Sequence, residues 1–179
     1  MISISKNNEV LKSTDEIQVI SENYINSLEF DAKMNVRKRI RRCTHIEVTD
    51  LVHEMFIVHE KNTYVRPHKH PGKSESLLVL KGEVDFITFD ELGNVNKVIE
   101  LSNNEAGNEF YIRLNSSIYH SLFIRSEYLI FLEVTSGPFV RDDMIFAPWS
   151  PDDNSIGLDK YLVELNKNVN DWKYKHIKL

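Results

Sequence analysis

The sequence predicts an all-β dominated protein, a sandwich or barrel of short antiparallel strands with a short helix near each end. The middle of the chain carries short segments rich in β-branched and aromatic residues, which favour strands. These segments are HIEVTDLVHEMFIVHE, TYVRPHKH, SLLVLKGEVDFITFD, NKVIEL, NEFYIRLN, YHSLFIRS and YLIFLEVT. Many short strands at close spacing are typical of an antiparallel sandwich or barrel.

Turn residues separate these segments and support the same prediction. Pro71-Gly72 follows the histidine-rich segment, and Gly82 interrupts the next apolar run. The stretch FDELGNVNKV predicts a hairpin that crosses around Gly93-Asn94.

Helical spacing of apolar residues occurs only near the two ends of the chain. In residues 15–29 it involves Ile17, Ile20, Tyr24 and Leu28, with Ser13 or Asp15 as the expected cap. Near the other end it involves Leu158, Tyr161, Leu162, Leu165 and Val169. We therefore expect an N-terminal helical and strand extension at 1–35, a barrel at 36–151, and a C-terminal helix with a loosely held tail at 152–179.

Composition and charge exclude several classes of protein. The chain has 179 residues, 41% of them apolar, which suits one globular domain with a sizeable core. A net charge of -5 argues against general affinity for nucleic acid. We find no apolar run near the ~20 residues that span a bilayer, no secretion signal, and only one cysteine, Cys43. These features predict a cytoplasmic protein with neither nucleic-acid nor membrane partners.

Two closely spaced histidines suggest a metal site. On a strand, His68 and His70 point to the same face with Cα atoms about 7 Å apart, so their imidazoles can converge on one ion. After the turn, Glu75 begins the next strand and offers a carboxylate. His120, in a later strand, is the best candidate for a fourth ligand.

Three histidines and one glutamate suit a divalent first-row metal, with Zn, Fe, Mn and Ni all acceptable. The alternative is a polar pocket without metal. The other histidines have no partner at ligand spacing, and we expect them to be structural. They are His45, His53, His59 and His176.

Three further residues are candidates for substrate binding, while catalytic residues stay unassigned. By alternation, Tyr64 and Arg66 share the face of the two histidines, and an arginine beside a metal suggests an anionic substrate group. Arg66 can instead pair with a surface acid at the barrel mouth. Glu133 lies among apolar residues, so its carboxyl is expected to be buried and paired, or to serve as an acid or base.

Two other motifs have open roles. The run VRKRIRR, Val36 to Arg42, carries five basic residues in seven. Its side chains face water, meet the phosphates of a nucleotide-linked sugar, or meet acids of a partner subunit. The segment FAPWSPDD, which begins at Phe146, is expected to pack over the barrel as a tail, a lid or a dimer contact.

The spacing of the histidines resembles a known motif. His68-x-His70, four residues, Glu75, six residues and Gly82 is similar to the first motif of the cupin superfamily. In that pattern these three residues and a histidine of a second motif, here His120, bind the metal. The resemblance implies a jelly-roll type β-barrel with the metal inside. The sequence departs from the motif six residues before His68, where Asn62 stands in place of glycine.

A narrower resemblance covers about Val36 to Leu165. The segments YVRPHKHPGKSESLLVLKGEV, LEVTSGPF and FAPWSPDD look like those of the WbuC family of small cupin metalloproteins. Such proteins are typically encoded among genes for bacterial O-antigen and other surface polysaccharides. The resemblance implies a homodimer and a small-molecule ligand, a sugar or nucleotide-sugar.

Three functions are compatible with these features. The first is a metal-dependent isomerase or epimerase acting on a sugar or nucleotide-sugar. The second is an Fe(II)-dependent oxygenase. The third is a non-catalytic module that binds a sugar or regulates a biosynthetic enzyme. A metal-free epimerase is disfavoured because the histidines stand at ligand spacing.

Overall fold

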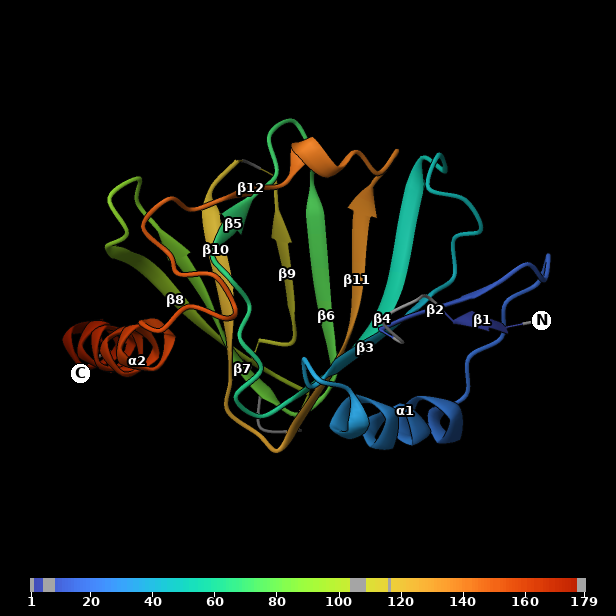
Figure 1. Ribbon diagram of the computed structural model, residues 1–179, viewed down its shortest axis with the longest axis horizontal. Helices are drawn as coiled ribbons and strands as arrows, with labels where there is room; N and C mark the ends of the chain where they lie inside the picture. The colour runs from blue at the N-terminus through green and yellow to red at the C-terminus, as the bar shows by residue number, and fades with distance from the viewer. Residues whose placement is uncertain (1, 5–8, 104–108, 116, 177–179) are drawn as a thin grey trace.

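Two antiparallel-rich sheets face each other and enclose the barrel (Figure 1). The computed structural model describes residues 2–4, 9–103, 109–115 and 117–176. Asn108, which opens the predicted segment NEFYIRLN, and residues 177–179 of the expected tail lie outside the described residues. Helix α1 (Glu22–Met34) covers part of the larger sheet, and helix α2 (Leu158–His176) lies against the smaller one. The predicted all-β dominated fold with a helix near each end is confirmed.

The larger sheet has the strand order β1-β2-β3-β4-β11-β6-β9. Its strands are β1 (Ile2–Ile4), β2 (Val10–Ser13), β3 (Arg39–Cys43), β4 (Val52–Glu60), β11 (Tyr128–Ser136), β6 (Glu75–Lys81) and β9 (Tyr111–Leu114). The smaller sheet has the order β12-β5-β10-β7-β8. Its strands are β12 (Ile145–Phe146), β5 (His68–Lys69), β10 (Tyr119–Ile124), β7 (Glu83–Phe89) and β8 (Val95–Ser102), and a short 3-10 helix, η1 (Arg141–Asp143), precedes β12.

Alternation along the strands divides the apolar residues between two faces. Ile57 and Phe131 point between the sheets, where the inner core forms. Val58 and Ile130, one residue away on the same strands, point outward and pack with Leu28 of α1. The larger sheet is therefore buried on both faces where α1 covers it, which explains its continuous apolar runs.

Helix α1 begins later than the predicted helix at 15–29. Its cap is Ser21, whose hydroxyl accepts a hydrogen bond from the Tyr24 backbone N–H at 3.2 Å. The Ser13 hydroxyl instead accepts from the Asp15 N–H in a local turn. Ile17 is 82% exposed and lies before the helix. The predicted cap was wrong because a second serine stands one turn before the apolar positions that the sheet buries.

Helix α2 confirms the predicted C-terminal helix and extends through most of the expected tail. Lys173 donates to Asp85 of β7 and Glu100 of β8, each at 2.6 Å. Trp172 donates its indole N–H to the carbonyl of Asn96. These contacts tie residues up to His176 to the smaller sheet, so the expectation of a loose tail was wrong for them. Neither helix is long and apolar enough to cross a membrane, within the part of the chain that the structure describes.

Two turns show how left-handed backbone is accommodated. The β7–β8 hairpin turns at Gly93, with φ of 91°, as predicted. A Cβ there would come within 2.8 Å of Trp149, so the FAPWSPDD segment packs directly on this turn. Asn62 stands where the cupin motif has glycine and adopts φ of 70°. Asparagine tolerates this region better than most residues, so the turn survives the replacement.

Candidate metal centre

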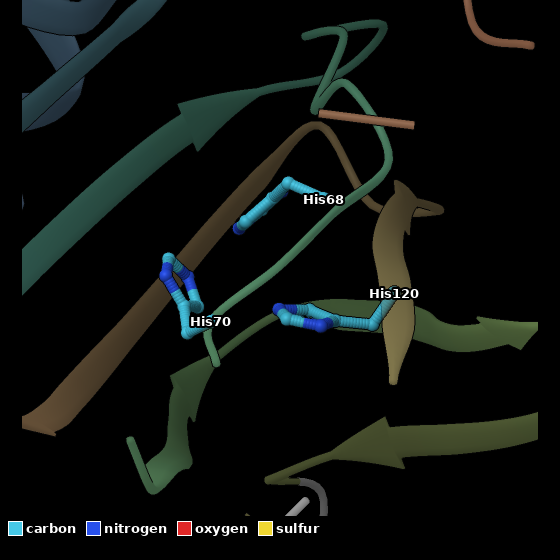
Figure 2. A group of neighbouring side chains, drawn as sticks. All are labelled: His68, His70 and His120. Atoms are coloured by element: carbon cyan, nitrogen blue, oxygen red, sulfur yellow. The ribbon is translucent and has the colours of Figure 1, made fainter. Parts of the chain in front are cut away.

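Two histidines at β5 and one on β10 lie close together (Figure 2). His68 on β5 pairs directly with His120 on β10. His70 follows β5 and completes the group. Each histidine offers one ring nitrogen, and these three atoms lie within 4.8 Å of one another. The three side chains can therefore hold one metal ion.

Backbone carbonyls set the orientation of two of the rings. His68 Nδ1 lies 2.8 Å from the carbonyl oxygen of Arg66, and His120 Nδ1 lies 2.9 Å from that of Ile118. A carbonyl can only accept, so each Nδ1 carries the proton and each Nε2 keeps its lone pair free. Hydrogen bonds of this kind commonly orient metal-binding histidines.

His120 Nε2 shows that the site fits a metal. This atom is buried, and it has no hydrogen-bond partner among the described residues. Its ring is 2% exposed and stacks on Phe86, with ring centroids 5.5 Å apart. A buried nitrogen lone pair without a partner is costly, and a cation between the three rings would satisfy it.

Glu75 lies beside the histidines at the start of β6. Its Oε2 atom is 3.4 Å from His70 Nε2 and 3.6 Å from His120 Nε2. The four predicted ligands are thus brought together, with donors of three nitrogens and one oxygen. This donor set suits a divalent first-row metal, as the sequence predicted, and does not select one of them.

The charges of the group depend on each other. Burial opposes ionisation of Glu75, but the nearby imidazoles, His120 foremost, hold its pKa below the usual value. Burial likewise opposes protonation of His120, but Glu75 outweighs it and raises the pKa of His120. At 3.6 Å this attraction is chiefly electrostatic. Burial lowers the pKa of His68 to about 3, so that ring stays neutral.

The histidine group opens into a cavity of about 510 Å³ between the two sheets. Apolar side chains line its middle: Met55, Ile57, Leu77, Phe86, Leu122 and Phe131. Basic side chains also line the cavity, from β3 and the residues before it, from both sides of β5 and from the segment after β11: Arg37, Arg39, Arg41, Arg66, Lys73 and Arg141. Leu122 and His120, two residues apart on β10, both line the cavity, as side chains that share one face of a strand do.

The strand predicted for TYVRPHKH is only two residues long, so alternation does not apply before His68. Val65 lines the cavity, although it was expected to point away from the histidines. Tyr64 is not among the lining residues. Its hydroxyl donates to the carbonyl of Pro151, and its ring contacts Tyr161 of α2. Strand β5 begins only at His68, directly after Pro67, which has no N–H to donate to a strand ladder.

Arg66 lies at the mouth of the cavity and is held by the closing segment. Its guanidinium donates to the Ser150 hydroxyl at 3.1 Å and to the Ser150 carbonyl at 3.0 Å, and it pairs with Asp152. The side chain also lies over the ring of Phe146, 4.8 Å from its centroid. This is the arrangement expected for an arginine that pairs with a surface acid at the barrel mouth.

Glu133 of β11 lines the cavity, and its carboxyl forms no hydrogen bond or ion pair with any described residue. Burial, with the negative charge of Glu75 in second place, raises the pKa of Glu133 to about 8. Of the two expected roles, pairing is therefore absent among the described residues. The carboxyl is protonated near neutral pH and can exchange a proton with a bound molecule.

Arginines of the basic run and two histidines, His53 and His59, line the cavity. Their place in the cavity was not predicted from the sequence. Arg39 and Arg41 alternate on β3 and both line the cavity with His59 of β4. His53 also lines it and stacks on His45 at 4.0 Å. The alternation of basic residues in VRKRIRR was the available signal, but the inward face of that strand depends on its pairing with β4.

Comparisons with known proteins agree with the fold. A family model described as a domain of unknown function (DUF6016) matches residues 20–101. Among curated proteins, none matches the chain significantly. An uncharacterised conserved protein from Klebsiella pneumoniae with a double-stranded β-helix domain is similar, with a TM-score of 0.53 and 15% identity over 74% of this chain and 98% of that one. The chain has the cupin fold.

A Shewanella oneidensis protein solved by X-ray crystallography supports the same cupin fold. It matches with a TM-score of 0.53 and 11% identity, over 72% of this chain and 85% of that one. At this level of identity the similarity concerns the fold, and the site must be judged on its own residues.

Proposed function

We propose that this cupin binds one divalent metal ion through His68, His70, His120 and Glu75. The observation that carries the proposal is the buried Nε2 atom of His120, which has no hydrogen-bond partner among the described residues and faces two other imidazoles and a carboxylate. When bound, such a metal supplies a Lewis acid that polarises a carbonyl or hydroxyl oxygen of the substrate.

We propose further that the site serves an isomerase or epimerase acting on a sugar or nucleotide-sugar. Both reactions can proceed by removal of a proton from a carbon atom and return of a proton to carbon, and Glu133 lines the cavity where it can take part in such a transfer. Its carboxyl faces the cavity, has no ion-pair partner among the described residues, and has a pKa of about 8. Apolar residues around it limit the access of bulk water.

The resemblance to the WbuC family supports a place in the assembly of bacterial surface polysaccharide such as O-antigen. The segments that carry this resemblance include both the histidine motif and FAPWSPDD, which closes over the barrel through Arg66 and Trp149. A sugar or nucleotide-sugar from that process is the proposed substrate.

Elemental analysis of protein purified without chelators tests the metal. We expect close to one equivalent of a first-row metal in the wild type and nearly none after His68→Ala. An Ala variant of His176, an exposed residue of α2, is the matched control and should keep its metal. Protein that takes up no zinc, iron, manganese or nickel would contradict the proposal.

A panel of nucleotide-sugars tests the reaction. Metal-loaded wild type should exchange a substrate C–H proton for deuterium from solvent, and Glu133→Gln should slow this exchange by about 100-fold or more. Glu127→Gln, at an exposed residue directly before β11, is the control. Oxygen uptake with iron and none with zinc would instead indicate an oxygenase. Binding without turnover would indicate a non-catalytic module.

A further inference from the structure

The end of the cavity opposite the histidines is basic. It is built by β3 and β4 at one side of the larger sheet, where Arg39 pairs in register with His59 and Arg41 pairs with Ile57. Arg39, Arg41 and His59 all line the cavity. The basic run therefore faces the interior of the barrel at these positions.

Two of the three arginines at this end form ion pairs with carboxylates of described residues, and the third does not. Arg37 bonds Glu9 at 3.3 Å and Asp153 at 2.6 Å, and Arg39 approaches the same Glu9 oxygen at 3.5 Å. The half-buried guanidinium of Arg41 forms no ion pair or hydrogen bond with any described residue. Glu133, two strands away in the same sheet, forms no ion pair with it, although the charge of Arg41 acts to lower the pKa of Glu133. Three guanidinium groups thus share two carboxylates, and one positive charge is left over.

His59 is a second, independent sign of a missing ligand. Its side chain is buried, with 6% exposure, and its Nδ1 atom has no hydrogen-bond partner in the described part of the chain. Its ring contacts Phe131 edge-on, and both residues line the cavity. Burial, followed by the charges of Arg39 and Arg41, lowers the pKa of His59 to about 3. The ring is therefore neutral and can donate one hydrogen bond to an anion.

The guanidinium of Arg41 and the imidazole of His59 both lack a partner for their N–H groups among the described residues. A partly buried positive charge without a counter-ion is unfavourable, and a guanidinium presents a planar fork of donors that matches an oxyanion. A nearby neutral imidazole adds one more donor. An anion of phosphate size would satisfy Arg41 and His59 at once.

We propose that Arg41, with Arg39 and His59 beside it, binds a phosphate group of the ligand whose other end reaches the histidines. This inference rests on the proposed function, because it names the substrate class of the same cavity. In the strand order of the larger sheet, β3 lies three strands from β6, which carries Glu75. At about 4.8 Å per strand the two ends are on the order of 14 Å apart. A sugar linked to phosphate spans such a distance better than a free sugar does.

Phosphate titration by isothermal calorimetry tests the inference directly. The probe is inorganic phosphate added to wild type, to Arg41→Met, and to Arg113→Met as the matched control. Arg113 is an exposed arginine of β9 that bonds Asn115, Ser74 and Ser76 and does not line the cavity. Both substitutions remove one positive charge. We expect Arg41→Met to weaken phosphate binding roughly tenfold or more and Arg113→Met to change it less than about twofold.

Arg41→Lys provides a second variant that keeps the charge but loses the fork, and its affinity should fall between wild type and Arg41→Met. Thermal unfolding of each variant verifies that it is folded. Wild type without phosphate binding, or equal affinities for the Arg41 and Arg113 variants, would overturn the inference.

Elemental analysis of the same preparations separates this inference from the proposed function. Phosphate binding that depends on Arg41 in a protein without metal would support the phosphate site and contradict the metal proposal. Normal metal content, together with a phosphate affinity that Arg41→Met does not change, would support the metal proposal and contradict the phosphate site.

Discussion

At both ends of the cavity, pairing between neighbouring strands brings polar side chains together, but one end suits a cation and the other an anion. At the histidine end, neighbouring strands of the smaller sheet place imidazole nitrogens beside the carboxylate of Glu75. At the arginine end, neighbouring strands of the larger sheet place guanidinium groups beside a neutral imidazole. The first end offers lone pairs to a cation, and the second offers N–H groups to an anion.

The difference shows how one cavity can keep opposite charges from neutralising each other. Met55, Ile57, Leu77 and Phe131, with the carboxyl of Glu133 among them, lie between the ends and separate Glu75 from Arg41. If those charged groups were adjacent, they would form an ion pair and neither would be available to a ligand. This middle part, apolar except for Glu133, therefore keeps both ends available for binding.

Removing a histidine should cause the largest change, a loss of metal affinity with little change in phosphate affinity. His120→Ala deletes a proposed ligand whose Nε2 atom has no hydrogen-bond partner in the described part of the chain, so we expect metal affinity to fall by about 100-fold or more. Competition with a chromophoric chelator measures it. Phosphate affinity in the same variant should stay within about threefold of wild type, since the charges of the arginine end are unchanged. Equal losses at both ends would show that they are not independent.

Glu133 lies between the two ends, and its titration should be visible in stability. The folded-state pKa of about 8 is raised above the ordinary value near 4.3. Its contribution to the free energy of unfolding is therefore fully present below about pH 4.3 and is lost as pH rises through about 8.

Glu133→Gln removes that titration. In metal-free protein, the variant should become more stable than wild type above about pH 8, by up to a few kcal/mol. Urea unfolding at several pH values measures it, with Glu127→Gln as control. A difference that does not change with pH would show that the carboxyl is ionised as usual.

The pH dependence of metal binding should be about tenfold per unit below the pKa of His120 and flat above it. Protons compete with the metal for His120, and Glu75 raises the pKa of that imidazole above its usual value near 6.5. Glu75→Gln removes the cause, so the break in the affinity curve should move to lower pH. A break that stays in place in Glu75→Gln would contradict this coupling.

The smallest effect is the influence of the arginine end on the metal. Arg41→Met removes a positive charge on the order of 14 Å from a divalent ion, which at an effective dielectric constant of 40–80 is worth roughly 0.6–1.2 kcal/mol. Metal affinity should therefore rise slightly, by less than about tenfold, and high salt should abolish the rise. A fall in metal affinity would mean that Arg41 supports the histidine end structurally.

Local patterns in the sequence determined much of the histidine end. His68, His70 and Glu75 are close in the chain, and Pro71-Gly72 turns it back between them. Spacing alone therefore predicts that these side chains can meet. The hairpin at Gly93 and the helix at Leu158–His176 were predictable for the same reason, since turn residues and helical periodicity act over a few residues.

Only the tertiary structure decided what reaches the cavity from far away. The pairing of His120 with His68 is a register between distant strands, and the inward face of Arg41 depends on burial of Ile40 and Val58 beneath α1. The same burial places the start of α1 after Ser21 instead of Ser13. Alternation states which side chains share a face, but which face looks inward is set by the apolar area that distant segments cover.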